Sequence, residues 1–168
     1  MPVWRAATIT HLMSRIRMTM QRPHIEQVPG LWERDGSLRD VYFFGADLYR
    51  WSKLIDYASM HRLTYIADGE AAVFPGVKEV FRLQETSHCL SIWIGDVCAN
   101  CHFFVSDEIE LDLDPREVLG PNEHDALLAF VEGAANAVGL NGVITPEGTE
   151  DAPFLTFDIN DQSWRVHG

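Results

Sequence analysis

Cysteine is scarce in this sequence: the chain has three, an odd number that cannot form a closed set of disulfides. We therefore expect reduced thiols and a cytoplasmic location. Long apolar runs are missing as well, and none approaches the ~20 residues that a membrane-spanning helix needs. Neither the glycine-rich nucleotide-binding loops nor the G-x-S-x-G and H-E-x-x-H motifs of hydrolases occur. The sequence thus predicts no cofactor and contains no familiar catalytic motif.

Basic residues are few: the chain has 13 Lys and Arg and 25 Asp and Glu, which gives a formal net charge of −12. A negative field of this size repels nucleic acid and anionic lipid, and it favours cations or a basic protein partner. We therefore expect a protein partner, and neither nucleic acid nor membrane. The chain has 168 residues, of which 46% are hydrophobic, enough for one domain with its own core.

The first 25 residues differ from the rest, because they carry four arginines and no acidic residue. They lack the apolar segment of a secretory signal. The sequence predicts a disordered or non-native arm over 1–25, with Met13, Met18 or Met20 as the native start, followed by a single α+β domain over 26–168. An organelle transit peptide is the alternative interpretation of the arm.

Two turn signals place hairpins in the chain. Asp68-Gly69 and Gly95-Asp96 each separate two runs rich in β-branched and aromatic residues, a pattern typical of hairpins. Further strands are predicted over 39–45, 108–115, 142–146 and 154–159, and a frayed tail over 160–168, with docking of Trp164 as the alternative. The meandering order of strands indicates a mainly antiparallel sheet.

Helical spacing occurs in two longer segments, at about 47–60 and 123–138. Asp47 is the expected N-cap of the first helix, and Asn122 and Gly139 are the expected N-cap and end of the second. A short helix is expected over 75–83. The predicted fold class is α+β, a single domain with a mainly antiparallel sheet and the two main helices packed on one face.

Cys98, Cys101 and His102 form a C-x-x-C-H pattern, which in other proteins attaches a c-type haem or marks a thiol redox or zinc site. Counting outward from the Gly95-Asp96 turn places Cys89 opposite His102. Because side chains alternate across a strand, Cys98 and Cys101 then point to opposite faces of the sheet. They cannot share a metal, a haem or a disulfide, and Cys101 is expected to be a buried structural residue.

One face of this hairpin gathers polar and sulfur-containing side chains: Cys89, Ser91, Cys98, Asn100 and His102. Two interpretations stay open. In the first, helices cover this face and the histidine has an ordinary partner. In the second, Cys89, Cys98 and His102 form a nucleophile–base pair or a zinc site. No Asp or Asn is evidently placed to orient the imidazole, which weakens the catalytic interpretation.

The segment from Glu108 to Asp114 alternates strictly, so that Glu108, Glu110, Asp112 and Asp114 share one face of a strand. A solvated or defended sheet face, recognition of a basic partner, and divalent cation binding are the three interpretations. The last is the weakest, because four carboxylates in a straight row do not converge on one point.

We predict a non-catalytic protein-binding domain, similar in size and charge to the small acidic immunity proteins that neutralise toxins. Its binding residues would be the four acidic residues with two aromatic anchors, Trp93 and Phe104. The alternatives are a Cys/His-dependent enzyme or zinc-binding protein that uses Cys89, Cys98 and His102, and a structural homodimer. His124 is expected to be solvated, and Arg39 to form weak surface ion pairs.

Overall fold

Within residues 21–168, the sheet contains nine antiparallel strands in the order β3-β2-β4-β5-β6-β1-β7-β8-β9. The computed structural model describes residues 21–168, and the arm predicted for 1–25 lies mostly outside them. β1 comes first in the chain but lies between β6 and β7. The strands are β1 (Arg39–Phe44), β2 (Arg62–Ala67), β3 (Glu70–Ala71), β4 (His88–Ile94), β5 (Val97–His102), β6 (Glu108–Leu113), β7 (Gly142–Pro146), β8 (Leu155–Asp158) and β9 (Ser163–Val166).

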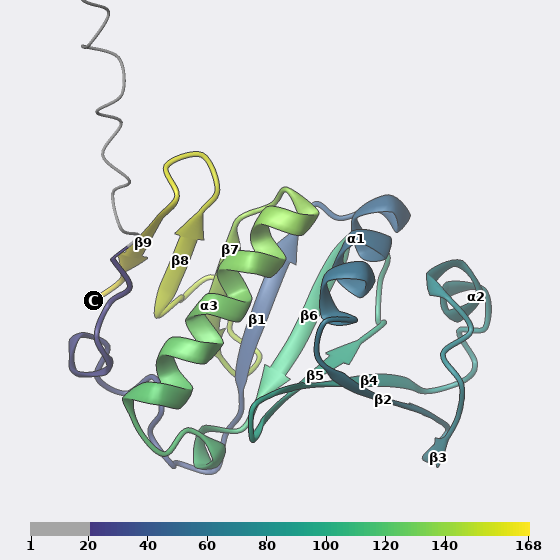
Figure 1. The fold of residues 1–168 in the computed structure, drawn as a ribbon, viewed down its shortest axis with the longest axis horizontal. Coiled ribbons are helices and arrows are strands. Elements are labelled where there is room, and N and C mark those ends of the chain that lie inside the picture. The colour runs from purple at the N-terminus through teal and green to yellow at the C-terminus, as the bar shows by residue number, and fades with distance from the viewer. Residues whose placement is uncertain (1–20) are drawn as a thin grey trace, which may run out of the picture.

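The described part of the chain has three α-helices, which pack on one face of this sheet (Figure 1). The helices are α1 (Leu48–Ala58), α2 (Val77–Arg82) and α3 (Pro121–Val138), with short 3-10 turns at Ile25–Gln27 and Pro115–Glu117. α1 and α3 lie side by side, and buried side chains from all three helices join those of the strands in one core. The predicted α+β class, with an antiparallel sheet and helices on one face, is confirmed. No helix of residues 21–168 is long and apolar enough to cross a membrane.

The hairpin at Gly95-Asp96 has the predicted register. Cys89 lies opposite His102 and Ile94 opposite Val97. Gly95 has a φ of +61°, which a glycine adopts readily and other residues rarely do. The same alternation holds in β6, where Ile109, Leu111 and Leu113 are all buried in the core. Apolar alternation therefore decides which side of each central strand faces the helices.

The helix termini follow local chemistry. The Asp47 carboxylate accepts a hydrogen bond from the Arg50 N–H at 2.8 Å, so the predicted N-cap of α1 is confirmed. α3 begins two residues earlier than predicted, because Pro121 takes its first position and Gly120 is the N-cap. Asn122 is therefore inside the helix and not its cap. Gly139 ends α3 in the left-handed conformation, as predicted.

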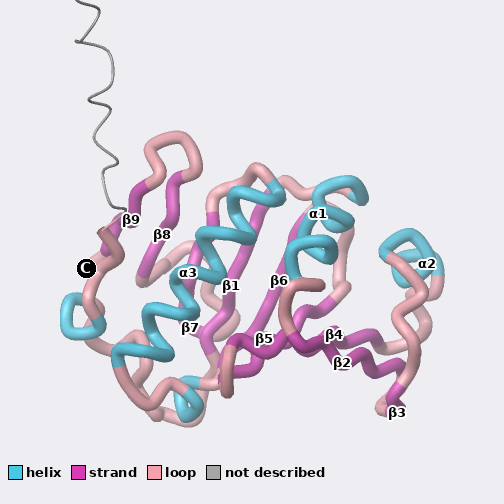
Figure 2. The backbone as a smooth tube through the Cα atoms, viewed as in Figure 1, coloured by secondary structure: helices cyan, strands magenta, loops and turns pink. Residues whose placement is uncertain are grey.

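The predicted frayed tail is wrong, because residues 163–166 form the edge strand β9 against β8 (Figure 2). The Trp164 ring packs on Phe157 with 5.3 Å between centroids. Its indole N–H also donates to Glu132 Oε1 on α3, at 2.7 Å. Partial burial of this ring, its hydrogen bond to Glu132 and the pairing of β9 with β8 together fix the end of the described chain to the core.

Two buried polar residues of α3 hold the residues that precede the sheet. Glu132 accepts two hydrogen bonds from the Arg22 guanidinium, at 2.8 and 2.7 Å. His124, expected at the surface, is fully buried: it accepts from the Trp32 indole at 2.9 Å and donates to the Pro23 carbonyl at 2.8 Å. Arg22 and Pro23, which the sequence assigns to the arm, therefore contact the helix.

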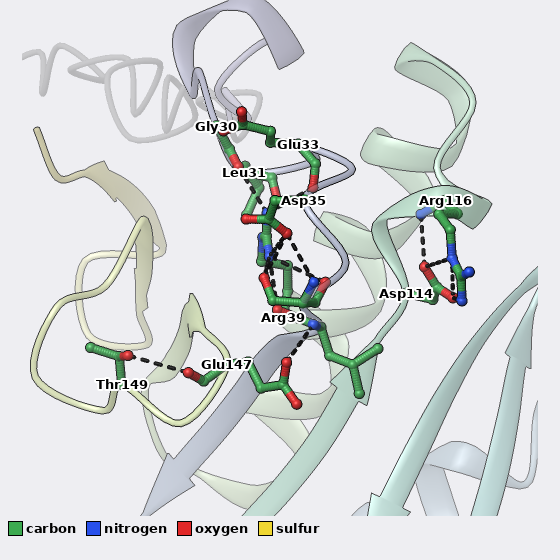
Figure 3. Close-up of polar contacts among 11 residues, drawn as sticks. Gly30, Leu31, Glu33, Asp35, Arg39, Asp114, Arg116, Glu147 and Thr149 are labelled. Atoms are coloured by element: carbon green, nitrogen blue, oxygen red, sulfur yellow. Dashed lines mark hydrogen bonds and ion pairs between the residues drawn. The ribbon is translucent and has the colours of Figure 1, made fainter.

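Arg39 is also buried, contrary to expectation, with an exposed fraction of 2%. Its guanidinium donates to backbone carbonyls of the segment before β1, including Leu31 at 2.6 Å and Glu33 at 2.9 Å (Figure 3). Asp35 lies 3.5 Å away. Because the charge is satisfied mainly by carbonyl oxygens, Arg39 organises this segment, and its role is not that of a weak surface ion pair.

Candidate functional site

The face of the sheet opposite α1, α2 and α3 carries most of the predicted site. We call it the helix-free face, and we call the row Glu108, Glu110, Asp112 and Asp114 the acidic strip. The strip runs along β6, in the middle of the sheet, and all four side chains are half-buried. The expectation that helices cover the polar side of the β4–β5 hairpin is therefore wrong.

Cross-strand rows place specific neighbours on each side of the acidic strip. In one row Glu108 pairs with Phe44 of β1. In the next, Glu110 lies between Tyr42 of β1 and His102 of β5. The strip is thus flanked by aromatic rings and an imidazole at one end.

The other central row brings two carboxylates together. Asp112 lies directly opposite Asp40 of β1 on one side and opposite Asn100 of β5 on the other. Asp40 is buried, and burial together with the charge of Asp112 raises the pKa of its carboxyl group. Burial also raises the pKa values of Glu108 and Glu110. Asp40, Glu108 and Glu110 are therefore partly desolvated carboxylates, whereas Asp114 forms an ion pair with Arg116 at 2.6 Å, which lowers the pKa of its carboxyl group (Figure 3).

The loop between β7 and β8 adds to this charge. Its Gly148 N–H donates to Asp40 at 2.7 Å, and Glu147 accepts from the Leu38 N–H at 2.9 Å (Figure 3). The charge of Glu150 contributes to the raised pKa of Glu108. The position of this loop depends on the pairing of β1 with β7.

His102 is oriented by a carboxylate that the sequence analysis missed. Its Nε2 lies 2.5 Å from Asp112 Oδ2, and Asn100 Nδ2 donates to the other oxygen of Asp112 at 3.0 Å. The Ser91 hydroxyl donates to Asn100 Oδ1 at 2.8 Å. The hydrogen bond to Asp112 raises the pKa of His102 although burial opposes the shift. The pair lies on a diagonal between β5 and β6, because His102 is directly opposite Glu110 and Asp112 is directly opposite Asn100.

The three cysteines are free thiols, and the sulfur atoms of Cys89 and Cys98 both point to Asn100 Oδ1. Cys101 is fully buried on the core face, as predicted, whereas Cys89 and Cys98 lie on the helix-free face. Burial raises the pKa values of all three thiols. Cys98 Sγ lies 3.4 Å from Asn100 Oδ1, an acceptor that favours the protonated thiol. Within residues 21–168, no group of three or more His, Cys, Asp or Glu is arranged to hold a metal ion.

The aromatic anchors differ in exposure. Phe104 is 63% exposed and stacks on His102, with 5.0 Å between centroids. Trp93 is half-buried, with the Arg62 guanidinium 4.2 Å from the centre of its ring. Phe44, which sequence reasoning did not single out, is 39% exposed and stacks on Tyr42. Alternation within β1 was the signal that could have placed it on this face.

Comparison with known proteins yields one weak structural likeness. No protein-family model and no curated protein matches the chain. The fold resembles a chain in the crystal structure of the toxic C-terminal tip of CdiA from Pseudomonas aeruginosa in complex with immune protein. That likeness has a TM-score of 0.45 and 16% sequence identity, and it covers 71% of this chain and 94% of the other.

The helix-free face is suited to contact and charge pairing more than to covalent chemistry. Burial raises the pKa values of the Cys89 and Cys98 thiols and so disfavours their thiolate forms, while Asp112 orients the His102 imidazole. Its carboxylates and exposed rings lie together on a sheet surface that the three helices leave uncovered. Exposed aromatic side chains therefore lie next to the negatively charged acidic strip.

Proposed function

We propose that this protein binds a basic protein partner through the helix-free face and performs no catalysis there. The single observation that carries the proposal is that Phe44 and Phe104, both exposed, flank the acidic strip on a face without helices. Aromatic residues surrounded by charge are typical of the residues that dominate binding energy at protein interfaces.

Electrostatics supports a cationic partner. Glu108 and Glu110 have raised pKa values, because burial and neighbouring carboxylates disfavour their charged forms. Lysine or arginine residues of a partner would supply the missing counter-charge. Complementary charge also speeds diffusional encounter, and this effect weakens as salt is added.

The biological setting in this proposal is that of an immunity or inhibitor protein in the cytoplasm. The weak likeness to a chain from a complex of a toxin tip with immune protein is compatible with that setting, but the proposal rests on the face itself. The three free cysteines are typical of a reducing compartment.

The test compares two double variants with the same change in net charge. Glu108→Lys/Glu110→Lys alters the acidic strip at two carboxylates that make no hydrogen bond within residues 21–168. Asp56→Lys/Asp161→Lys alters two exposed acids, one on α1 and one in the β8–β9 turn. The probe is a fluorescein-labelled nona-arginine peptide, followed by fluorescence anisotropy at low salt.

We expect about tenfold weaker binding of the peptide to the strip variant and less than about twofold weaker binding to the control. Charges that touch the bound peptide act on it strongly, whereas distant charges are screened by salt. Equal losses in both variants would show that net charge alone is recognised and would overturn the proposal. Absence of wild-type binding at low salt would do the same.

A further inference from the structure

A cavity of about 380 Å³ lies beside the helix-free face. The loop residues 84–88 form one wall, and His102, Phe103 and Phe104 form the other. Small-molecule sites occupy roughly 300–1,000 Å³, so this cavity is near the small end of that range. It is large enough for one amino-acid side chain and too small for a large ligand.

The cavity wall is held rigidly. His88 Nε2 lies 2.9 Å from the Leu83 carbonyl, which can only accept, so Nε2 carries the proton. His88 Nδ1 then accepts from the Tyr65 hydroxyl at 2.5 Å. The Ser87 N–H donates to Asp68 at 2.7 Å, and the Asp68 N–H donates to the Ser87 carbonyl at 2.9 Å. The loop is therefore formed before any partner arrives, which lowers the cost of binding.

Polar groups around the cavity are free to bind a cation. Its lining includes the carboxylate Glu85 and no lysine or arginine. Within the described part of the chain, the side chains of Gln84, Glu85, Thr86 and Ser87 make no hydrogen bond. Their oxygen atoms would accept hydrogen bonds from a cationic donor.

The aromatic wall favours a flat cation. One face of the Phe104 ring stacks on His102, and the ring is still 63% exposed, so its other face is open. A guanidinium stacks on such a ring and donates in its own plane at the same time, whereas an ammonium is a compact, strongly hydrated charge. The charge of the His102 imidazole is countered by Asp112 and Glu110.

We propose that this cavity receives an arginine side chain of the basic partner, with its guanidinium between Phe104 and Glu85. This inference rests on the proposed function and names the anchor residue of that interface. It goes beyond general charge attraction, because it requires arginine in preference to lysine at one position.

The test uses the ¹⁵N-labelled full-length protein and three small probes: N-acetyl-arginine methylamide, its lysine counterpart and the uncharged citrulline counterpart. We expect the arginine probe to shift the amide resonances of residues 84–88 and 102–104. We expect the affinity for the lysine probe to be about fivefold lower and the citrulline probe to produce no shift.

Variants sharpen the assignment. Phe104→Leu and Glu85→Gln should each lower the affinity for the arginine probe about fivefold. Glu70 is an exposed acidic residue of the neighbouring β3, and Glu70→Gln should leave this affinity unchanged. Equal affinity for arginine and lysine, or shifts confined to β6, would overturn the inference. In that case the nona-arginine experiment on the acidic strip still decides the proposed function by itself.

Discussion

His102 and Asp112 form a hydrogen bond between neighbouring strands, with 2.5 Å between Nε2 and Oδ2. The bond raises the pKa of His102, so the folded protein holds this proton more tightly than the unfolded chain, where the pKa is about 6.5. Its contribution to stability is therefore complete below about pH 6.5 and is lost as the pH rises through the folded pKa.

Replacement of this histidine should thus have a pH-dependent cost. We expect His102→Gln to lower the free energy of unfolding more at about pH 6 than at about pH 9, as measured by urea unfolding. In an Asp112→Asn background the difference between the two pH values should shrink. A cost that is equal at both pH values, or larger at the higher one, would contradict the role of the pair.

The thiols should be unreactive in the folded protein. Burial raises the pKa values of Cys89, Cys98 and Cys101, and Cys101 has no exposed surface. At about pH 7.5 we expect Ellman's reagent to label all three at least about tenfold more slowly than glutathione, and at the normal rate in concentrated guanidinium. One thiol that reacts faster than glutathione would instead favour the Cys/His-dependent enzyme.

Gly133 of α3 lies against the side chain of Tyr57 of α1. A Cβ at this position would lie 2.0 Å from the Tyr57 hydroxyl oxygen, so Gly133→Ala forces the helices or the ring to move. We expect a loss of about 1–3 kcal/mol in the free energy of unfolding, measured with urea. In a Tyr57→Ala background the same change should be neutral or stabilising by up to about 1 kcal/mol, because alanine favours helix. The same loss in both backgrounds would rule out the steric explanation.

Glu132 joins both ends of the described chain to α3. It is 5% exposed, and it accepts hydrogen bonds from Arg22 and from the Trp164 indole. Glu132→Ala should lower the free energy of unfolding by about 2 kcal/mol or more and accelerate amide hydrogen exchange in β9. Arg22→Ala should lower the free energy of unfolding by less, because the hydrogen bond from Trp164 to Glu132 remains. If Arg22→Ala accelerates exchange in β9 to the same degree, the bond to Trp164 is not what holds the strand.

Local patterns predicted much of this fold because they act over short distances. The Gly95-Asp96 turn and the alternation on either side of it are enough to determine the β4–β5 register, including Cys89 opposite His102. The same reasoning correctly separated Cys98 from Cys101. It also placed the acidic strip on one side of β6.

Pairing between distant segments could not be predicted in this way. The contact of Asp112 with His102, and that of Asp112 with Asp40, depend on which strands lie on either side of β6. Likewise, the burial of Arg39 and His124 depends on a segment that folds back over the end of the sheet and the first turn of α3. Charge and polarity alone place both residues at the surface, because the carbonyl and indole partners that bury them leave no pattern in the sequence.

The position of β1 determines when the sheet can be completed during synthesis. This strand leaves the ribosome first, yet its two neighbours are β6, which ends at Leu113, and β7, which begins at Gly142. The β2–β6 meander can therefore collapse on its own, whereas β1 stays without a partner until most of the chain has emerged. Such high contact order slows folding, and the acidic face can be completed only after its earliest strand has paired with β6.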